Sequence, residues 1–241
     1  MAKARNAARE ALELDPNLAE AHVTRAYIEF LRDWDWQASE RDFLKAIELD
    51  PDYVVAHQWY SEFLGVMGRH DEGIVESIRA VALEPTSSLQ LRVLGNSYRQ
   101  AGRYAEAIEH LNKADELDDS HQGTLYYLTQ TYWESGMHAE AIVAANRWDE
   151  RWGRFYGFLA EGKPHEALPV LEEFAEDEIN DELWVYSYVL AGENEKALGL
   201  LEELFRRRDV LLPPSLTDNI LDPIAEEPRV VEIRRSIGLE P

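Results

Sequence analysis

The chain has 241 residues, no cysteine and a formal net charge of −23, from 47 acidic and 24 basic side chains. The absence of cysteine excludes disulfides and metal sites built from thiolates. A surface this negative repels nucleic-acid phosphates and anionic lipids, so we expect neither nucleic acid nor a membrane as partner, whereas it would attract a basic partner. The first residues have no apolar signal core, and no stretch approaches the roughly 18 apolar residues that span a bilayer, which predicts a cytoplasmic protein.

A seven-residue phrase recurs along the chain. It reads GRHDEGI at 68–74, GRYAEAI at 102–108 and GMHAEAI at 136–142, so its glycines lie 34 residues apart. Weaker copies stand at 162–168 and 192–198. A fixed period in this range predicts one supersecondary unit stacked on itself, which is a solenoid.

Each unit is predicted to be a helix, a turn and a second helix. The glycine suits the left-handed residue that ends the first helix, and the following glutamate suits the positive end of the second helix dipole. Proline ends the second helix, at Pro16, Pro51 and Pro85, with spacings of 35 and 34 residues. Two independent markers therefore share one period.

This pattern resembles the tetratricopeptide repeat (TPR) family, in which small residues sit where paired helices touch and large residues fill the neighbouring holes. The unit at 88–121 fits best, with these residues at family positions: Leu94, Gly95, Tyr98, Ala107, Leu111 and Ala114. The resemblance implies an all-α fold, a right-handed TPR superhelix (α-solenoid) with an irregular C-terminal part and a capping helix.

The resemblance also divides the chain, as one TPR solenoid over 1–241, into the following units in order: a half-repeat at 1–18; TPR units at 19–53, 54–87, 88–121 and 122–150; two shortened units in 151–208; and a C-terminal cap at 209–241. Within the cap, apolar residues at helical spacing predict a short helix over 229–237 that covers the last repeat. The missing first helix before 1–14 suggests either a piece of a longer chain or a protein that begins with a half-repeat.

Two units depart from the family pattern. The first carries DWDW at 33–36 in place of the glycine turn, and we expect Trp34 and Trp36 to replace that turn by packing. The fourth has Trp148 where the family has a small residue, and the next glycine follows after only 26 residues, at Gly162. We therefore expect a kink or a change of superhelix pitch near 145–160.

The tail and the opening resemble a narrower group. LDPI at 221–224, EPRV at 227–230 and the opening phrase at 11–22 look like TPR regions at the C-termini of bacterial winged-helix regulators, adenylate or guanylate cyclases and serine/threonine kinases. This resemblance implies a regulatory arm of a bacterial signalling protein.

In TPR arrays the first helix of each pair lines the concave face, which the family uses to bind peptides. Carried over by repeat position, the predicted peptide- or protein-binding residues are Thr24, Tyr27, Gln58, Trp59, Glu62, Arg92, Asn96, Arg99, Tyr126, Tyr127, Gln130 and Trp133, with Val23, Phe30 and Val93 beside them. Aromatic side chains offer rigid contact area, and amides pair with a peptide backbone. We therefore expect a protein or peptide partner in the groove.

Other functions of these residues are less favoured. Arg92 and Asn96 lie four apart on one helical face and resemble half of a carboxylate clamp, but the neighbouring basic residues are missing, so solvated side chains with Arg92 paired to an acid are the preferred interpretation. His22 and His57 occupy one repeat position, which indicates a structural role and no metal site. We expect no cofactor.

No phosphate loop or nucleophile arrangement is present, so an enzyme is not expected. The favoured function is a non-catalytic scaffold for protein–protein interaction. Two alternatives stay open: a self-assembly module that stacks through its ends into a homo-oligomer, and a small-molecule sensor with an aromatic pocket formed by Trp148, Trp152, Phe155 and Tyr156.

Overall fold

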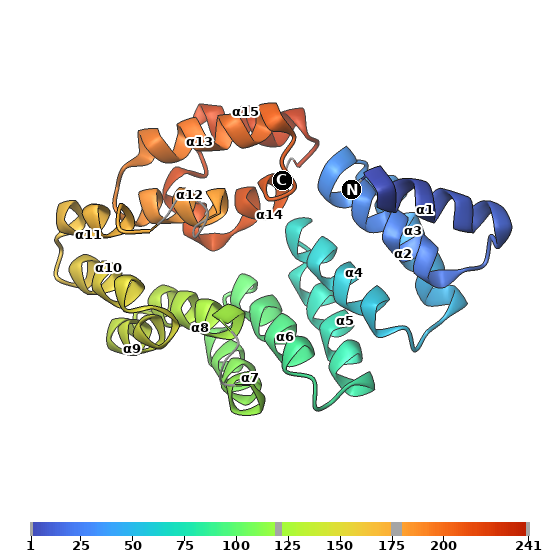
Figure 1. Ribbon diagram of the computed structural model, residues 1–241, viewed down its shortest axis with the longest axis horizontal. Helices are drawn as coiled ribbons and strands as arrows, with labels where there is room; N and C mark the ends of the chain where they lie inside the picture. Colours follow the sequence, from blue (N-terminus) through green and yellow to red (C-terminus); the bar gives the residue numbers. More distant parts are fainter. Residues whose placement is uncertain (1, 119–121, 175–179, 240–241) are drawn as a thin grey trace.

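The computed structural model shows paired antiparallel helices arranged in an arc (Figure 1) and describes residues 2–118, 122–174 and 180–239. Its elements are α1 (Ala2–Leu14), α2 (Ala19–Ile28), the π-helical turn η1 (Glu29–Asp33), α3 (Trp36–Leu49), α4 (Val54–Val66), α5 (His70–Leu83), α6 (Ser88–Gln100), α7 (Tyr104–Leu117), α8 (Gln122–Glu134), α9 (His138–Trp148), α10 (Glu150–Ala160), α11 (Pro164–Leu171), α12 (Asp181–Leu190), α13 (Asn194–Arg207), α14 (Leu212–Thr217), the 3₁₀ turn η2 (Asn219–Ile224) and α15 (Pro228–Ser236). The described ranges contain no strand. The predicted all-α solenoid is confirmed.

The helices pack as pairs, and the pairs pack in register. The helices pair as α2 with α3, α4 with α5, α6 with α7, α8 with α9, α10 with α11 and α12 with α13. Between successive pairs, α4 contacts α2 and α6, and α6 also contacts α8. Gly95 shows why small residues recur at these contacts. A Cβ added at Gly95 in α6 would lie 2.6 Å from Cγ of Leu111 in α7, so any larger residue would push the pair apart.

The turns between paired helices use left-handed backbone. Gly68 and Gly102 both have φ of 70°, a conformation that costs other residues energy. In the first unit Trp34 takes this role, with φ of 59°. The extra residue of this unit is accommodated just before it, in the π-helical turn η1, where Asp35 N donates to Glu29 O at 3.1 Å.

Two histidines at the same repeat position, His22 and His57, join their units to the loop before them. The Nδ1 atom of His22 lies 3.0 Å from Oδ1 of Asp42. Its Nε2 atom lies 2.9 Å from the carbonyl oxygen of Pro16. His57 makes the equivalent contacts one unit later, with Nε2 2.9 Å from the carbonyl oxygen of Pro51. Both rings are buried and act as structural bridges.

The last elements return to the first unit, and one hydrophobic core joins α2–α4 with α12–α15. The indole N–H of Trp36 in α3 donates to the carbonyl oxygen of Ile237 at 2.7 Å, so the residues after α15 lie beside α3 (Figure 1). Trp34 stacks on Phe205 with ring centroids 6.0 Å apart and carries the Arg208 guanidinium 4.7 Å above its ring. The tryptophan phrase therefore closes the arc, in addition to forming its own turn.

The cap does more than the sequence indicates. Helix α15 packs on α13, as a cover for the last pair would, but the cap also contacts the first unit through Ile237. Between them, α14 and η2 form what we call the inner segment, which lies on the inside of the arc. There α14 packs against α4, and η2 packs against α12.

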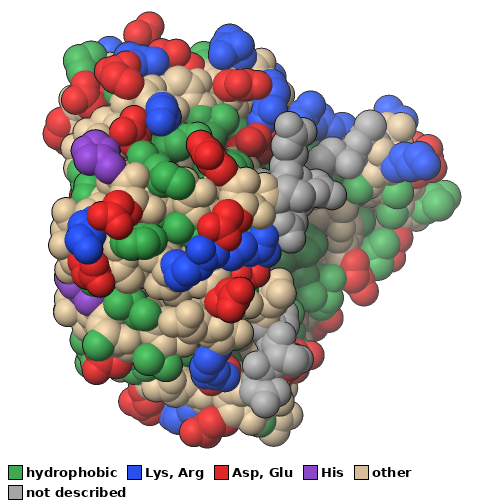
Figure 2. All heavy atoms as spheres, turned by 60° about the vertical axis from the view of Figure 1, so that its left-hand side comes forward, with side chains coloured by type: hydrophobic (Ala, Val, Ile, Leu, Met, Phe, Trp, Pro, Cys, Tyr) green, Lys and Arg blue, Asp and Glu red, His purple; other side chains and the backbone are tan. Residues whose placement is uncertain are grey.

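Acidic and basic side chains are interspersed on the face that carries α9–α11, shown in Figure 2. Several of them pair between helices, as Arg147 does with Asp115 at 2.7 Å. No helix within the described ranges has the length and apolar character needed to cross a membrane.

Candidate binding groove

The first helices of four successive units, α2, α4, α6 and α8, face the inner segment across a cavity of about 500 Å³, which we call the groove cavity. Val210, Leu211 and Pro214 close it from the C-terminal side, and Glu182 reaches it from α12. Half of the residues predicted from the repeat positions line this cavity: Tyr27, Gln58, Glu62, Arg92, Asn96 and Tyr127. Phe30 and Val93 line it as well.

The other predicted residues lie elsewhere. Trp59 stacks on Tyr27 with centroids 4.2 Å apart and does not itself line the cavity. Gln130 is buried and donates to the hydroxyl of Tyr126 at 2.8 Å. Trp133 stacks on His138 with centroids 4.3 Å apart and belongs to the core of α9–α11.

Two residues on α2 do not face the groove cavity. Thr24 donates from its hydroxyl to the carbonyl oxygen of Glu20 at 2.8 Å, within its own helix. Val23 is buried in the core between the helices. Neither residue lines the groove cavity, because α2 and η1 present only Tyr27, Phe30 and Leu31 to it, and their part in binding a partner stays a prediction.

A chain of amides leads to a carboxyl group at the cavity wall. Gln90 Nε2 donates to Gln58 Oε1 at 3.2 Å, and Gln58 Nε2 donates to Glu62 Oε1 at 3.3 Å. Burial raises the pKa of Glu62 to about 6, although the Gln58 hydrogen bond and the charge of Arg92 act in the opposite direction. Oε1 of Gln90 is buried and has no hydrogen-bond partner among the described residues.

Arg92 lines the same cavity from α6. Its Nε is buried without a hydrogen-bond partner, and the guanidinium forms no ion pair within 4.0 Å in the ranges that the structure describes. The preferred expectation of an acid paired to Arg92 is therefore wrong. Asn96 is also not paired with Arg92 as in a carboxylate clamp. Its Oδ1 instead accepts a hydrogen bond from Arg99 Nε at 3.0 Å.

Arg99 holds the inner segment. Only 1% of its side chain is exposed, and it forms ion pairs with Glu134 of α8 and, at 2.6 Å, with Asp218 between α14 and η2. Asn219 Nδ2 donates to the Arg99 carbonyl oxygen at 3.1 Å. Burial acts to lower the pKa of Arg99, but the charges of Asp218 and Glu134 outweigh burial and raise it. This predicted groove residue therefore already binds a carboxylate from its own chain.

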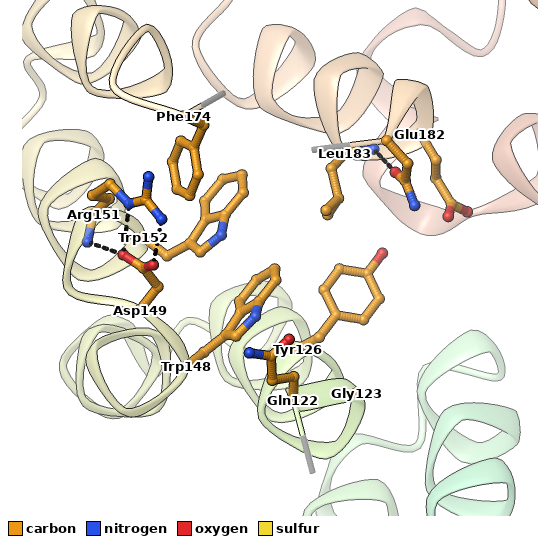
Figure 3. Close-up of a pocket in the computed structure, with 11 residues that line it drawn as sticks. Gln122, Gly123, Tyr126, Trp148, Asp149, Arg151, Trp152, Phe174, Glu182 and Leu183 are labelled. Carbon is orange, nitrogen blue, oxygen red and sulfur yellow. Dashed lines mark hydrogen bonds and ion pairs between the residues drawn. The ribbon is translucent and has the colours of Figure 1, made fainter. Parts of the chain in front are cut away.

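A second cavity, of about 410 Å³, lies beside the groove cavity, and we call it the aromatic pocket (Figure 3). Trp148 and Trp152 stack with centroids 5.0 Å apart, and Phe174 lies 5.0 Å from Trp152. Asp149 accepts from Arg151 Nη2 at 2.7 Å, and this bond is the main reason that the pKa of Asp149 is lowered. Of the residues proposed for such a pocket, Phe155 and Tyr156 lie in the core instead.

The two cavities share Glu182. Tyr126 lines the aromatic pocket and Tyr127 the groove cavity, with their rings 5.0 Å apart. Glu182 accepts a hydrogen bond from the Tyr186 hydroxyl at 2.9 Å, and burial raises its pKa to about 7. Sequence analysis missed Glu182 and Asp218, because neither belongs to a recognisable repeat phrase.

These features define a class of protein: an α-helical solenoid whose first helices line an inner groove. A tetratricopeptide repeat family model matches residues 98–151, from the end of α6 to the start of α10. Residues 98–151 therefore carry tetratricopeptide repeat sequence, and the rest of the chain continues the same helix-pair architecture. No curated protein matches its sequence.

Solved structures share the fold at low identity. The APC/C hetero-tetramer Cut9-Hcn1 matches with a TM-score of 0.65 and 16% identity over 98% of this chain and 45% of that one. YrrB, a TPR protein with an unusual peptide-binding site, matches with a TM-score of 0.52 and 16% identity. The match covers 79% of this chain and 98% of YrrB. An O-GlcNAc transferase of Thermobaculum terrenum matches at 0.50 and 24% over 55% of this chain, which spans only 26% of that enzyme.

Proposed function

We propose that the concave groove binds a segment of a partner protein whose side chains enter the groove cavity. The observation that carries this proposal is the cavity itself, which combines apolar walls with the unpartnered Nε of Arg92. Buried polar groups without partners cost free energy, so a ligand that satisfies them gains affinity. The Gln58 and Asn96 amides at the wall suit peptide groups.

The inner segment supports the same proposal. It is a piece of chain lying against the first helices, held there by Asp218 on Arg99 and by Asn219 on the Arg99 carbonyl. A groove that accommodates its own chain has the width and the hydrogen-bonding groups for another one. In the wider context, the tail phrases favour a regulatory arm of a bacterial signalling protein.

The experiment is a binding screen with an array of short synthetic peptides of random sequence. Val93 lines the groove cavity, so Val93→Trp should fill it and weaken the selected peptides about tenfold or more. Val143 on α9 is 62% exposed, so Val143→Trp makes the same chemical change away from the groove. Equal binding by both variants, or no selected peptide at all, would contradict the proposal.

A small-molecule site is the second candidate, and the aromatic pocket favours it. Stacked Trp148 and Trp152 with Phe174 form a concave aromatic surface of the kind that binds planar ligands (Figure 3). A metabolite that raises the melting temperature of the protein, and no longer does so for Trp148→Ala, would support this function. If no metabolite of a screened library raises the melting temperature, the result would count against a small-molecule site.

A further inference from the structure

Two carboxyl groups at the groove cavity form no ion pair with a side chain of the described residues, although the charge of Arg92 acts on one of them, Glu62. Glu62 receives one hydrogen bond, from Gln58, and Glu182 receives one, from Tyr186. Within the described part of the chain, neither carboxylate lies within 4.0 Å of a lysine, arginine or histidine nitrogen. Poorly solvated carboxylates are normally paired, and these two are partly exposed, so they are available to a ligand.

The charge balance around them is negative. The carboxyl groups of the groove cavity and the Arg99 cluster are Glu62, Glu134, Glu182 and Asp218, and the guanidinium groups are Arg92 and Arg99. Arg99 is fully engaged by Glu134 and Asp218. The cavity therefore presents two carboxyl groups, of Glu62 and Glu182, and one guanidinium group, of Arg92, to a ligand.

Burial raises the pKa of both cavity carboxyl groups, of Glu62 to about 6 and of Glu182 to about 7. The raised values mean that the negative charges are poorly solvated where they lie. A cation placed beside either carboxylate would restore the interaction that water provides elsewhere. A neutral or acidic group would not.

The walls suit the rest of a long basic side chain. Tyr27 and Tyr127 line the cavity, and Trp59 backs Tyr27 in a stacked pair. Aromatic faces attract ammonium and guanidinium groups, and Arg99 already lies 5.9 Å from the centroid of the Tyr127 ring. Phe30 and Pro214 offer apolar surface for the methylene groups.

We infer that the protein segment bound in the groove carries a lysine or arginine whose cationic group enters the groove cavity and pairs with Glu62 and Glu182. This inference rests on the proposed function. The net charge of −23 acts in the same direction, because it attracts basic segments from a distance. Arg92 remains available for a peptide carbonyl or a carboxylate next to the basic residue.

The test uses the peptide array and a charge-matched pair of variants. Glu62→Gln/Glu182→Gln removes the two carboxylates, and Glu150→Gln/Glu166→Gln makes the same change of net charge at two exposed positions. We expect the selected peptides to contain lysine or arginine. Their Kd should rise about tenfold or more in the groove variant, and by less than about twofold in the surface variant.

Replacing a lysine of a selected peptide by norleucine, or an arginine by citrulline, should cause a similar loss, because norleucine keeps the carbon chain of lysine and citrulline the shape of arginine while the charge is removed. Circular dichroism should show that both variants stay folded, since glutamine removes a poorly solvated charge at both groove positions. If selected peptides bind without a basic residue, or bind both variants equally, the inference is overturned while the proposed function stands. If no peptide binds the wild type, both fail.

Discussion

The buried Asp218–Arg99 ion pair gives the sharpest test of the structure. The side chain of Asp218 is 8% exposed and that of Arg99 is 1% exposed, and their charged atoms lie 2.6 Å apart. Asp218→Asn keeps the shape of the side chain and removes its charge. Removing one partner of a buried pair typically costs about 3–5 kcal/mol. Because Glu134 still pairs with Arg99, we expect a loss just below that range, about 2–3 kcal/mol.

For a chain of this length each kcal/mol lowers the melting temperature by roughly 2–4 °C, so Asp218→Asn should lower it by roughly 4–12 °C. Thermal and urea unfolding followed by far-ultraviolet circular dichroism measure the change. Asp222→Asn is the matched control, since Asp222 lies four residues further on, within η2, but is exposed, and it should shift stability by less than about 0.5 kcal/mol. Equal shifts for the two variants would refute the assignment of the inner segment to Arg99.

Four other variants test separate features of the fold by melting temperature, and the first of them also by amide exchange. Trp36→Phe removes the N–H that donates to Ile237 and should cost about 1–2 kcal/mol, with faster amide exchange in α15; unchanged exchange would argue against the closed arc. Glu182→Gln should stabilise the protein above pH 7 but not below pH about 4.5. The pKa of Glu182 is raised to about 7 in the folded protein, so the folded state loses stability only as this carboxyl group ionises. An equal gain at both pH values would contradict this. Gly199→Ala, in helix α13 with open space around the new Cβ, should add about 0.5–1 kcal/mol. Gly68→Ala, also in open space but at φ of 70°, should instead cost about 1 kcal/mol, and the same sign for both would be inconsistent with the left-handed turn.

The part of the fold that depends on local pattern could be predicted from the sequence. Gly68 and Gly102 mark left-handed turns because no other residue adopts that backbone so readily, and they repeat at the helix-pair period. The position of Tyr27 or Arg92 on a first helix follows from the same period. Half of the predicted groove residues therefore lie around one cavity.

The closed arc could not be predicted in this way. Asp218 meets Arg99 across 119 residues, and no periodic signal relates the two positions. Trp34 shows the same limit, since its left-handed backbone sits in a turn that the sequence indicates, while its stacking on Phe205 depends on the path of the whole solenoid. The partners of Arg99 and the contents of the groove follow from that long-range path.

Closure of the arc changes how such a chain should unfold. In a linear repeat array each unit contacts only its neighbours, so the ends fray first and the middle follows. Here Trp36 and Ile237 are 201 residues apart and still share a hydrogen bond, and Arg32 donates to the Arg208 carbonyl across 176 residues. The first and last units therefore stabilise each other, and loss of either exposes the core of both. We expect one cooperative transition in place of stepwise fraying, with slow folding, because the contacts that complete the fold are the most distant in sequence.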